Sequence, residues 1–295
     1  MSVSAVERAQ FRWHAADMND AILDAFAIYQ RSQRLALTTI KNRRHLLDGF
    51  SRRASLPLLQ ATTQDLRADL AREGVEPGTI RTERGALQAF YRFAVEDGYL
   101  TVDPSAALKP VRVPKNVARP FSVAQIEALL SSGVRRRTRA MILLGYYQGF
   151  RVSQIARVRG DDVDLLSGRL RTVAKGDKVR WVPLHPVIAE LALDMPRVGW
   201  WFPARDGSDT PIQGASVTDI ISKAKRRAGI TDPKLTPHSL RHSCGTELGE
   251  AGVDLRVIQE ILLHETIQST EIYTAVSERR KRDGVEALPT LRLAA

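Results

Sequence analysis

The sequence contains a single cysteine, Cys244, and no long apolar run. One cysteine excludes an intramolecular disulfide and a cysteine-based zinc cluster, so we expect Cys244 to be a buried structural thiol. No run of about 18 apolar residues is available to span a membrane, and residues 1–17 lack the apolar core of a signal peptide. We therefore expect a cytoplasmic protein without a membrane partner.

Nucleotide-binding and metal-binding motifs are also missing. There is no Walker A sequence and no GxGxxG, so neither an ATP site nor a dinucleotide site is predicted. His264 and Glu265 begin like HExxH, but Gln268 stands where the second histidine would be, so no zinc pair forms. Ser222 and Lys225 match S-x-x-K without a KTG or SDN partner. We expect no cofactor and no metal.

Acidic residues are too few to balance the basic ones. The 44 lysines and arginines exceed the 33 aspartates and glutamates, and the formal net charge is +11. Because arginine pairs bidentately with phosphate, this excess favours a nucleic-acid partner over a membrane surface. Charge alone leaves open a second interpretation, a basic protein that binds no specific DNA.

Apolar periodicity predicts a small helical bundle over residues 18–105. Its four helices are expected at residues 18–33, 37–55, 62–74 and 76–100. Thr38 or Thr39 is a candidate cap of the second helix. Residues 1–17 form an arm that is either loose or a short helix, and residues 106–118 form a proline-rich basic linker.

The remaining domain, residues 119–278, begins with helices. Ser122 can cap the first, and Gly149 can end a strongly apolar second helix. Arg151 follows at once in a sharp turn, before Ser153 can cap the next helix. This turn is expected to hold the head group of Arg151 in place.

A period-two segment then predicts a β-hairpin. Strands at residues 169–174 and 179–184 are expected to pair through a turn at Gly176 and Asp177, with Lys175 at the tip. A merely exposed turn lysine is the alternative for Lys175. The predicted fold is mainly α with a small antiparallel sheet, an α+β catalytic domain behind a helical bundle.

The stretch from residue 236 onward carries the candidate chemistry. Thr236 can cap a helix and Pro237 suits its first position, which places His238 in the first turn and Arg241 on the same face. A helix start with an imidazole and a guanidinium favours an anion, and phosphate in particular. Further on stand a second histidine, His264, and a phenol, that of Tyr273, and a phenol near such groups can attack phosphorus.

Four segments in this order, QGFRVSQ, VAKGDKVRWVPL, HSLRHS and LLHETIQSTEIYT, resemble the boxes of the tyrosine recombinase (phage integrase) family. The resemblance covers essentially the whole chain. It implies that Tyr273 is the nucleophile and that Arg151 and Arg241 clamp the scissile phosphate. It further implies that His264 supports that phosphate, that Lys175 protonates the leaving 5′ oxygen and that His238 assists proton transfer.

The resemblance implies a site-specific DNA recombinase that forms a 3′-phosphotyrosyl intermediate without metal or ATP. Phage or mobile-element integration and excision is the expected setting, with Xer-like dimer resolution as an alternative. A relaxing enzyme similar to type IB topoisomerases and a catalytically silent DNA-binding regulator are the rivals. Two positions depart from the family pattern: Gln154 replaces an acidic residue, and Leu263 replaces a glycine.

By the same resemblance, the chain is similar to compact two-domain, Xer-like members without an arm-binding domain, and its bundle to a SAM-like core-binding domain. The expected assembly is a homotetramer on double-stranded attachment sites, bacterial or phage-encoded and nucleoid-associated, with a host bending factor or directionality factor as a further partner. The tail, residues 279–295, is expected to dock on a neighbouring subunit or, alternatively, on its own domain. The expected DNA-binding residues are Thr39, Lys41, Arg43, Arg44, Thr79, Arg81, Arg84, Arg112 and Lys115.

Overall fold

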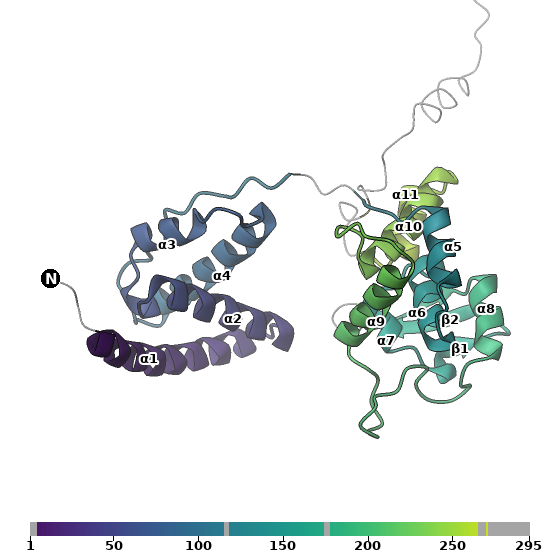
Figure 1. The fold of residues 1–295 in the computed structure, drawn as a ribbon. Helices are drawn as coiled ribbons and strands as arrows, with labels where there is room; N and C mark the ends of the chain where they lie inside the picture. Colours follow the sequence, from purple (N-terminus) through teal and green to yellow (C-terminus); the bar gives the residue numbers. More distant parts are fainter. Residues whose placement is uncertain (1–4, 115–117, 174–177, 265–269, 271–295) are drawn as a thin grey trace, which may run out of the picture. The chain divides into compact units, whose positions relative to one another are not determined.

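The computed structural model describes residues 5–114, 118–173, 178–264 and 270, and the side chains from residue 19 onward (Figure 1). The chain divides into two units, residues 1–115 and 116–295, and each is considered by itself.

The first unit is helical, as the periodicity predicts. Its elements are α1 (Ala5–Ser32), α2 (Leu37–Ala54), the 3-10 turn η1 (Leu58–Gln60), α3 (Thr63–Leu70) and α4 (Pro77–Glu96). Helix α1 therefore includes residues 5–17 of the expected arm. The aromatic rings of Phe26, Phe90 and Phe93 meet in the core between α1 and α4, with ring centroids 5.1 to 6.2 Å apart.

The expected cap of α2 is wrong. Ala36 occupies the N-cap position with an extended backbone and no side-chain hydrogen bond. The backbone amide of Thr39 donates to the Ala36 carbonyl at 2.9 Å, so Thr38 and Thr39 both lie inside the first turn. The helix starts two or three residues earlier than a cap at Thr38 or Thr39 requires, because Leu37 already has helical geometry.

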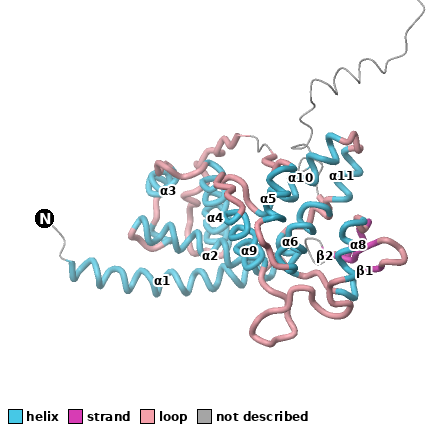
Figure 2. The backbone as a smooth tube through the Cα atoms, turned by 45° about the vertical axis from the view of Figure 1, so that its right-hand side comes forward, coloured by secondary structure: helices cyan, strands magenta, loops and turns pink. Residues whose placement is uncertain are grey.

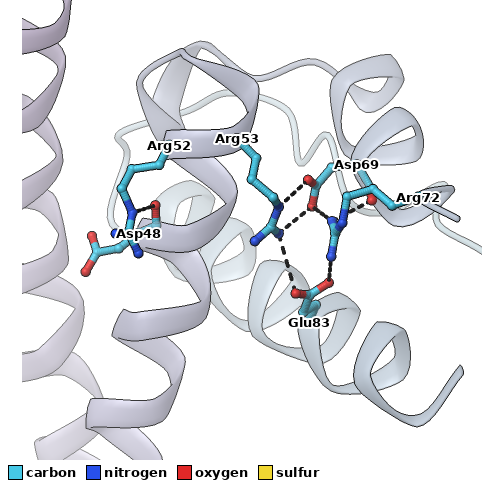
Figure 3. A network of polar contacts seen from close by, with 6 residues as sticks. All are labelled: Asp48, Arg52, Arg53, Asp69, Arg72 and Glu83. Carbon is cyan, nitrogen blue, oxygen red and sulfur yellow. Dashed lines mark hydrogen bonds and ion pairs between the residues drawn. The ribbon is translucent and has the colours of Figure 1, made fainter. Parts of the chain in front are cut away.

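An ion-pair network with two buried carboxylates and two partly exposed arginines joins three helices of this unit (Figure 3). Arg53 on α2 donates two bonds of 2.8 Å to Asp69 on α3. Arg72, just after α3, contacts Asp69 and donates to Glu83 on α4 at 2.7 Å. Burial raises the pKa of Asp69, but hydrogen bonds from the two arginines outweigh it, and the net pKa is lowered. The network ties the short helix α3 to both of its neighbours.

The second unit places helices around a small sheet (Figures 1 and 2). Its helices are α5 (Val123–Ser131), α6 (Arg136–Tyr147), α7 (Val152–Ala156), η2 (Gly160–Asp162), α8 (Pro186–Leu193), α9 (Gly214–Arg227), α10 (Pro237–Glu250) and α11 (Leu255–Ile261). The strands β1 (Val163–Asp164), β2 (Arg169–Val173) and β3 (Val179–Pro183) pair antiparallel in the order β1-β2-β3. Helix α6 is the centre of the core and packs against α8, α9 and α10.

Several local expectations are confirmed in this unit. Ser122 caps α5 through a reciprocal pair of bonds with Gln125, of 3.2 and 3.0 Å. The hairpin pairs as predicted, with Leu170 opposite Val182, although its turn lies outside the described residues. Cys244 is buried, and burial raises the pKa of its thiol to about 11. None of the described helices is both long and apolar enough to cross a membrane.

Candidate active site

The turn after α6 carries Arg151 and is shaped by a glycine. Gly149 has φ +60°, and a Cβ atom there would lie 2.3 Å from Cδ2 of Leu262. The predicted helix stop at Gly149 is confirmed, and only glycine fits without displacing Leu262. Gly145, one turn earlier, lies so close to Leu240 that an added Cβ would be 3.0 Å away. Helix α10 can therefore pack directly on α6, which brings its polar face beside the turn.

Arg241 on α10 lies inside this contact, with 1% of its surface exposed. Its Nη1 donates to the Gly149 carbonyl at 2.5 Å, and its Nη2 donates to the Leu262 carbonyl. A guanidinium keeps its charge when buried, and carbonyl oxygens satisfy and orient its donors. One side chain thus connects the turn before Arg151 with the turn before His264.

His264 follows α11 and is held by its backbone and by its ring. Its amide donates to the Gln259 carbonyl at 3.0 Å, and Nδ1 lies 2.7 Å from the Thr270 hydroxyl. Burial, followed by the charges of Arg241 and Arg151, lowers the pKa of His264 to about 3. The ring is therefore neutral at pH 7 and adds no charge of its own to the site.

The backbone conformation of Leu263, the residue before His264, explains why a glycine is usual at this position in the family pattern. Leu263 has φ +52°, in the left-handed region where glycine is favoured. The backbone here turns in the way that a glycine would allow, and Leu263 takes the same conformation while packing on the core. The turn that presents His264 is therefore retained at the cost of local strain.

His238 lies in the first turn of α10, as the Thr236 cap and Pro237 predict. Its side chain is partly solvent-exposed, and its ring stands edge to face with that of His242, with centroids 4.7 Å apart. Burial, then His242, Arg241 and Arg151, lower the pKa of His238. His242 also has a lowered pKa, from burial and then from Arg241. His242 is not among the residues predicted from the sequence, although its spacing of four residues from His238 places both on one helix face.

Gln154, the second residue that departs from the family pattern, supports Arg151 through its backbone amide. Gln154 accepts a 3.1 Å bond from the Arg151 amide, and its own amide group donates to Thr172 on β2 at 3.3 Å. Gln154 therefore supports Arg151 by a hydrogen bond to the main chain. The expectation that Ser153 caps α7 is wrong, because Arg151 itself is the N-cap residue and Ser153 lies inside the helix.

The structure brings Arg151, His238, Arg241 and His264 within electrostatic range of one another. Lys175 and Tyr273 lie outside the described residues. The strands that flank Lys175 are paired up to Val173 and Val179. Among the described residues, no cluster of three or more His, Cys, Asp or Glu could hold a metal ion.

The expected DNA-binding residues fall into two groups. Exposed side chains are found at Thr39, Lys41, Thr79, Arg81 and Arg112. The others hold parts of the first unit together: Arg43 donates to Gln30 at 3.1 Å, Arg44 pairs with Asp20 and Asp24, and Arg84 donates to the Leu108 carbonyl at 2.8 Å. Lys115 lies outside the described residues. The sequence could not separate the exposed residues from the bonded arginines, because the acceptors of those arginines lie 13 to 24 residues away along the chain.

The described part of the site contains four residues from the sequence boxes: Arg151, His238, Arg241 and His264. The profile of the phage integrase family matches residues 120–280. The chain therefore belongs to the phage integrase family and is a tyrosine recombinase of the Xer type, an enzyme of site-specific recombination.

Relatives of known name match over most of their length. Tyrosine recombinase XerD of Yersinia pestis is 30% identical over 292 residues, which are 89% of this chain and 94% of the relative. XerD of Listeria innocua is 31% identical over 229 residues, 72% of this chain and 76% of the relative.

Solved structures share the fold. A lambda integrase (75–356) dimer bound to a COC′ core site has a TM-score of 0.68 at 19% identity, over 84% of this chain and 95% of that one. XerH bound to a palindromic difH substrate has a TM-score of 0.68 at 21% identity, over 88% and 82%. The predicted fold class, mainly α with a small antiparallel sheet, is confirmed.

Proposed function

We propose that this recombinase cleaves and rejoins duplex DNA through Tyr273, with Arg151 and Arg241 on the scissile phosphate. The observation that carries the proposal is the placement of Arg241. Its guanidinium is buried and fixed by the Gly149 and Leu262 carbonyls, which lie in the turns that lead to Arg151 and His264. A guanidinium fixed in this way keeps its charge and holds its planar donors in place, a geometry that matches the oxygens of a phosphodiester.

The charges fit phosphoryl transfer. Two permanently charged guanidiniums face a phosphodiester that carries one negative charge and gains more in the transition state. The neutral imidazole of His264 supplies a hydrogen bond rather than charge, because its pKa of about 3 keeps it unprotonated. Preorganised donors of this kind stabilise the developing charge, which is the role that a metal has in other phosphoryl-transfer sites.

In the proposed reaction, the Tyr273 hydroxyl attacks phosphorus and the bond from phosphorus to the 5′ oxygen breaks. The 5′ oxygen takes a proton from Lys175, and the 3′ phosphate remains linked to Tyr273. The free 5′ hydroxyl of another strand then attacks this link and releases the tyrosine. His238 accepts or returns the phenol proton, which its lowered pKa permits because a neutral imidazole has an acceptor nitrogen.

Residues 18–105 hold the duplex in this proposal, with the exposed group Thr39, Lys41, Thr79, Arg81 and Arg112 as the backbone contacts. A homotetramer on paired sites is the proposed assembly. Support comes from a fold relative, a lambda integrase tetramer bound to a Holliday junction, whose TM-score is 0.66. Residues 279–295 would link neighbouring subunits.

Phage or mobile-element integration and excision is the proposed setting. Chromosome dimer resolution is the second candidate, and the near full-length match to XerD of Yersinia pestis favours it. The two differ in substrate: an integrase joins two different sites, whereas a dimer-resolving enzyme recombines two copies of one chromosomal site. Recombination of plasmids carrying either DNA flanking the gene or the chromosomal replication terminus distinguishes them.

The decisive experiment is a covalent trap. Purified protein is incubated in EDTA with duplexes tiled across the flanking DNA, nicked so that the released strand diffuses away. We expect a protein–DNA band on a denaturing gel for the wild type and none for Tyr273→Phe. If the protein binds DNA but gives no covalent band, even on nicked substrates, the proposal is wrong and the protein is a DNA-binding regulator.

A further inference from the structure

Helices α6 and α9 form a second cationic surface, which we name the α6–α9 surface. An open depression between them is lined by Thr138 of α6 and by residues of α9: Ile220, Lys223, Arg226 and Arg227. The sequence RRRTR at the start of α6 surrounds Thr138. The exposed cations of the surface are Arg135, Arg136, Arg137, Arg139, Lys223, Arg226 and Arg227.

Few groups in the described part of the chain neutralise these cations. Lys223 pairs with Asp219 at 2.6 Å, and Arg137 donates to the Pro203 carbonyl at 3.2 Å. Within the described ranges, no carboxylate forms an ion pair with the arginines at positions 135, 136, 139, 226 and 227. The surface therefore presents most of its charge to solvent.

The start of α6 is an unfavourable place for arginine. The first turn of a helix carries the positive end of its dipole, which acidic residues stabilise and basic residues destabilise by about 0.3–1 kcal/mol each. Helix α6 has no acidic residue in its first turn, while Arg136 and Arg137 occupy it and Arg135 precedes it. Folding alone does not explain this choice of residues, whereas binding an anion does.

The α6–α9 surface lies away from the candidate active site. Helix α6 has 12 residues, and at about 1.5 Å per residue it is about 18 Å long. Its far end leads through Gly149 to Arg151, whereas the arginine-rich segment is at its beginning. Cations here do not reach the phosphodiester that Arg151 and Arg241 hold.

We infer that the α6–α9 surface binds the phosphate backbone of a stretch of duplex DNA other than the one being cleaved. This inference rests on the proposed function, because it extends the contact between the recombinase and DNA. Six of the seven exposed cations are arginines, whose forked guanidinium groups match phosphate oxygens. Among the described residues that line the depression, Ile220 is the one apolar side chain. An acidic protein partner would need a cluster of aromatic or aliphatic anchors, and a single half-buried isoleucine does not supply one.

The test compares two double variants of the full chain. Arg139→Ser with Arg226→Ser removes one cation from each helix of the surface. Arg197→Ser with Arg256→Ser removes two exposed arginines elsewhere in the second unit and is the matched control. Both double variants lower the net charge equally, so any difference in their DNA binding depends on where the removed charges lie. Thermal unfolding of all three proteins verifies that the fold is intact.

Binding is measured against salt on duplexes of about 30 and about 90 base pairs that share one cleavage site, since each phosphate contact contributes about 0.9 to the salt slope. The surface variant is expected to lose about 2 from the slope on the long duplex, and to keep wild-type affinity and covalent trapping on the short one. If the surface variant binds the long duplex no more tightly than the short one, whereas the wild type prefers the long duplex, the ligand of the surface is flanking DNA. Loss of capture of a second labelled duplex by the covalent complex would identify a separate duplex.

Equal salt slopes for the surface variant and the control would overturn the inference. So would a surface variant that fails on the short duplex, because the surface would then belong to the cleaved segment. Binding of a polyglutamate peptide that only the surface variant loses, with unchanged DNA binding, would assign the surface to a protein partner. A wild type that binds long duplexes through the surface without any covalent band would contradict the proposed function and leave this inference standing.

Discussion

The guanidinium of Arg241 donates to the carbonyl of Gly149, a residue 92 positions earlier in the chain. Gly149 adopts a positive φ and lies too close to Leu262 for any side chain, so its carbonyl direction is set by the backbone. The same guanidinium also bonds to the Leu262 carbonyl. The geometry of the site thus depends on main-chain carbonyls, which a motif of side chains in the sequence does not identify.

Arg241→Lys is expected to keep the charge and lose activity. An ammonium cannot bond to two carbonyls and a phosphate in the planar geometry of a guanidinium. Losing one preorganised donor in a phosphoryl- or acyl-transfer site costs about 100-fold to 1,000-fold in rate. Single-turnover cleavage of a nicked duplex measures this loss, and DNA affinity by filter binding is the control. A lysine variant within about threefold of wild type would show that charge alone suffices.

Gly149→Ala is expected to destabilise the second unit. The added methyl would meet Leu262 at 2.3 Å and adopt an unfavourable φ, which together cost about 2–4 kcal/mol. Gly168→Ala is a matched control, because that glycine also has positive φ but no atom within 4 Å of an added Cβ. Urea unfolding of both variants separates the clash from the conformational strain. Equal losses for the two would mean that the contact with Leu262 relaxes freely.

Leu263→Gly is expected to destabilise the protein less than Leu263→Val does. Glycine relieves a left-handed strain of about 1 kcal/mol, which offsets part of the lost packing. Valine is β-branched and tolerates a positive φ poorly, so it should be destabilising and should displace His264. Thermal unfolding and cleavage rates are the measurements. A valine variant that cleaves as fast as the glycine variant would separate this turn from the placement of His264.

His264 is expected to make the free protein acid-sensitive. Its pKa of about 3 in the folded chain lies below the unfolded value near 6.5, so the unfolded state binds more protons between these two values. Stability should therefore fall as the pH drops below about 6.5, by about 1.4 kcal/mol per pH unit for this group. Unfolding free energies at several pH values, for wild type and His264→Asn, report the difference in slope. Identical slopes would assign the acid sensitivity to other groups.

Ion pairs of the first unit that involve buried and exposed carboxylates should differ in energy. Asp69→Ala removes a buried carboxylate shared by Arg53 and Arg72, which are partly exposed and keep Glu83 as a partner, so we expect a loss of about 1.5–3 kcal/mol. Asp20→Ala removes one partner of Arg44 at an exposed site and should cost under about 1 kcal/mol. Chemical denaturation of the two variants makes the comparison. A small loss for Asp69→Ala would mean that water replaces the carboxylate.

The sequence by itself determined the local structure and the family. The Ser122 cap, the Gly149 stop and the β2–β3 hairpin follow from residues within a few positions of one another, where backbone preference and side-chain chemistry decide the outcome. The order and spacing of the four boxes indicated the phage integrase family for the same reason, because each box is short and local.

Only the tertiary structure decided which polar groups meet. Arg44 and Arg84 looked like their exposed neighbours in sequence, yet they bond to Asp20, Asp24 and the Leu108 carbonyl. Arg241 acquires its partners 92 and 21 residues away. A long side chain has the same local preferences whether its acceptor is protein or DNA, so its role depends on packing that brings distant segments together.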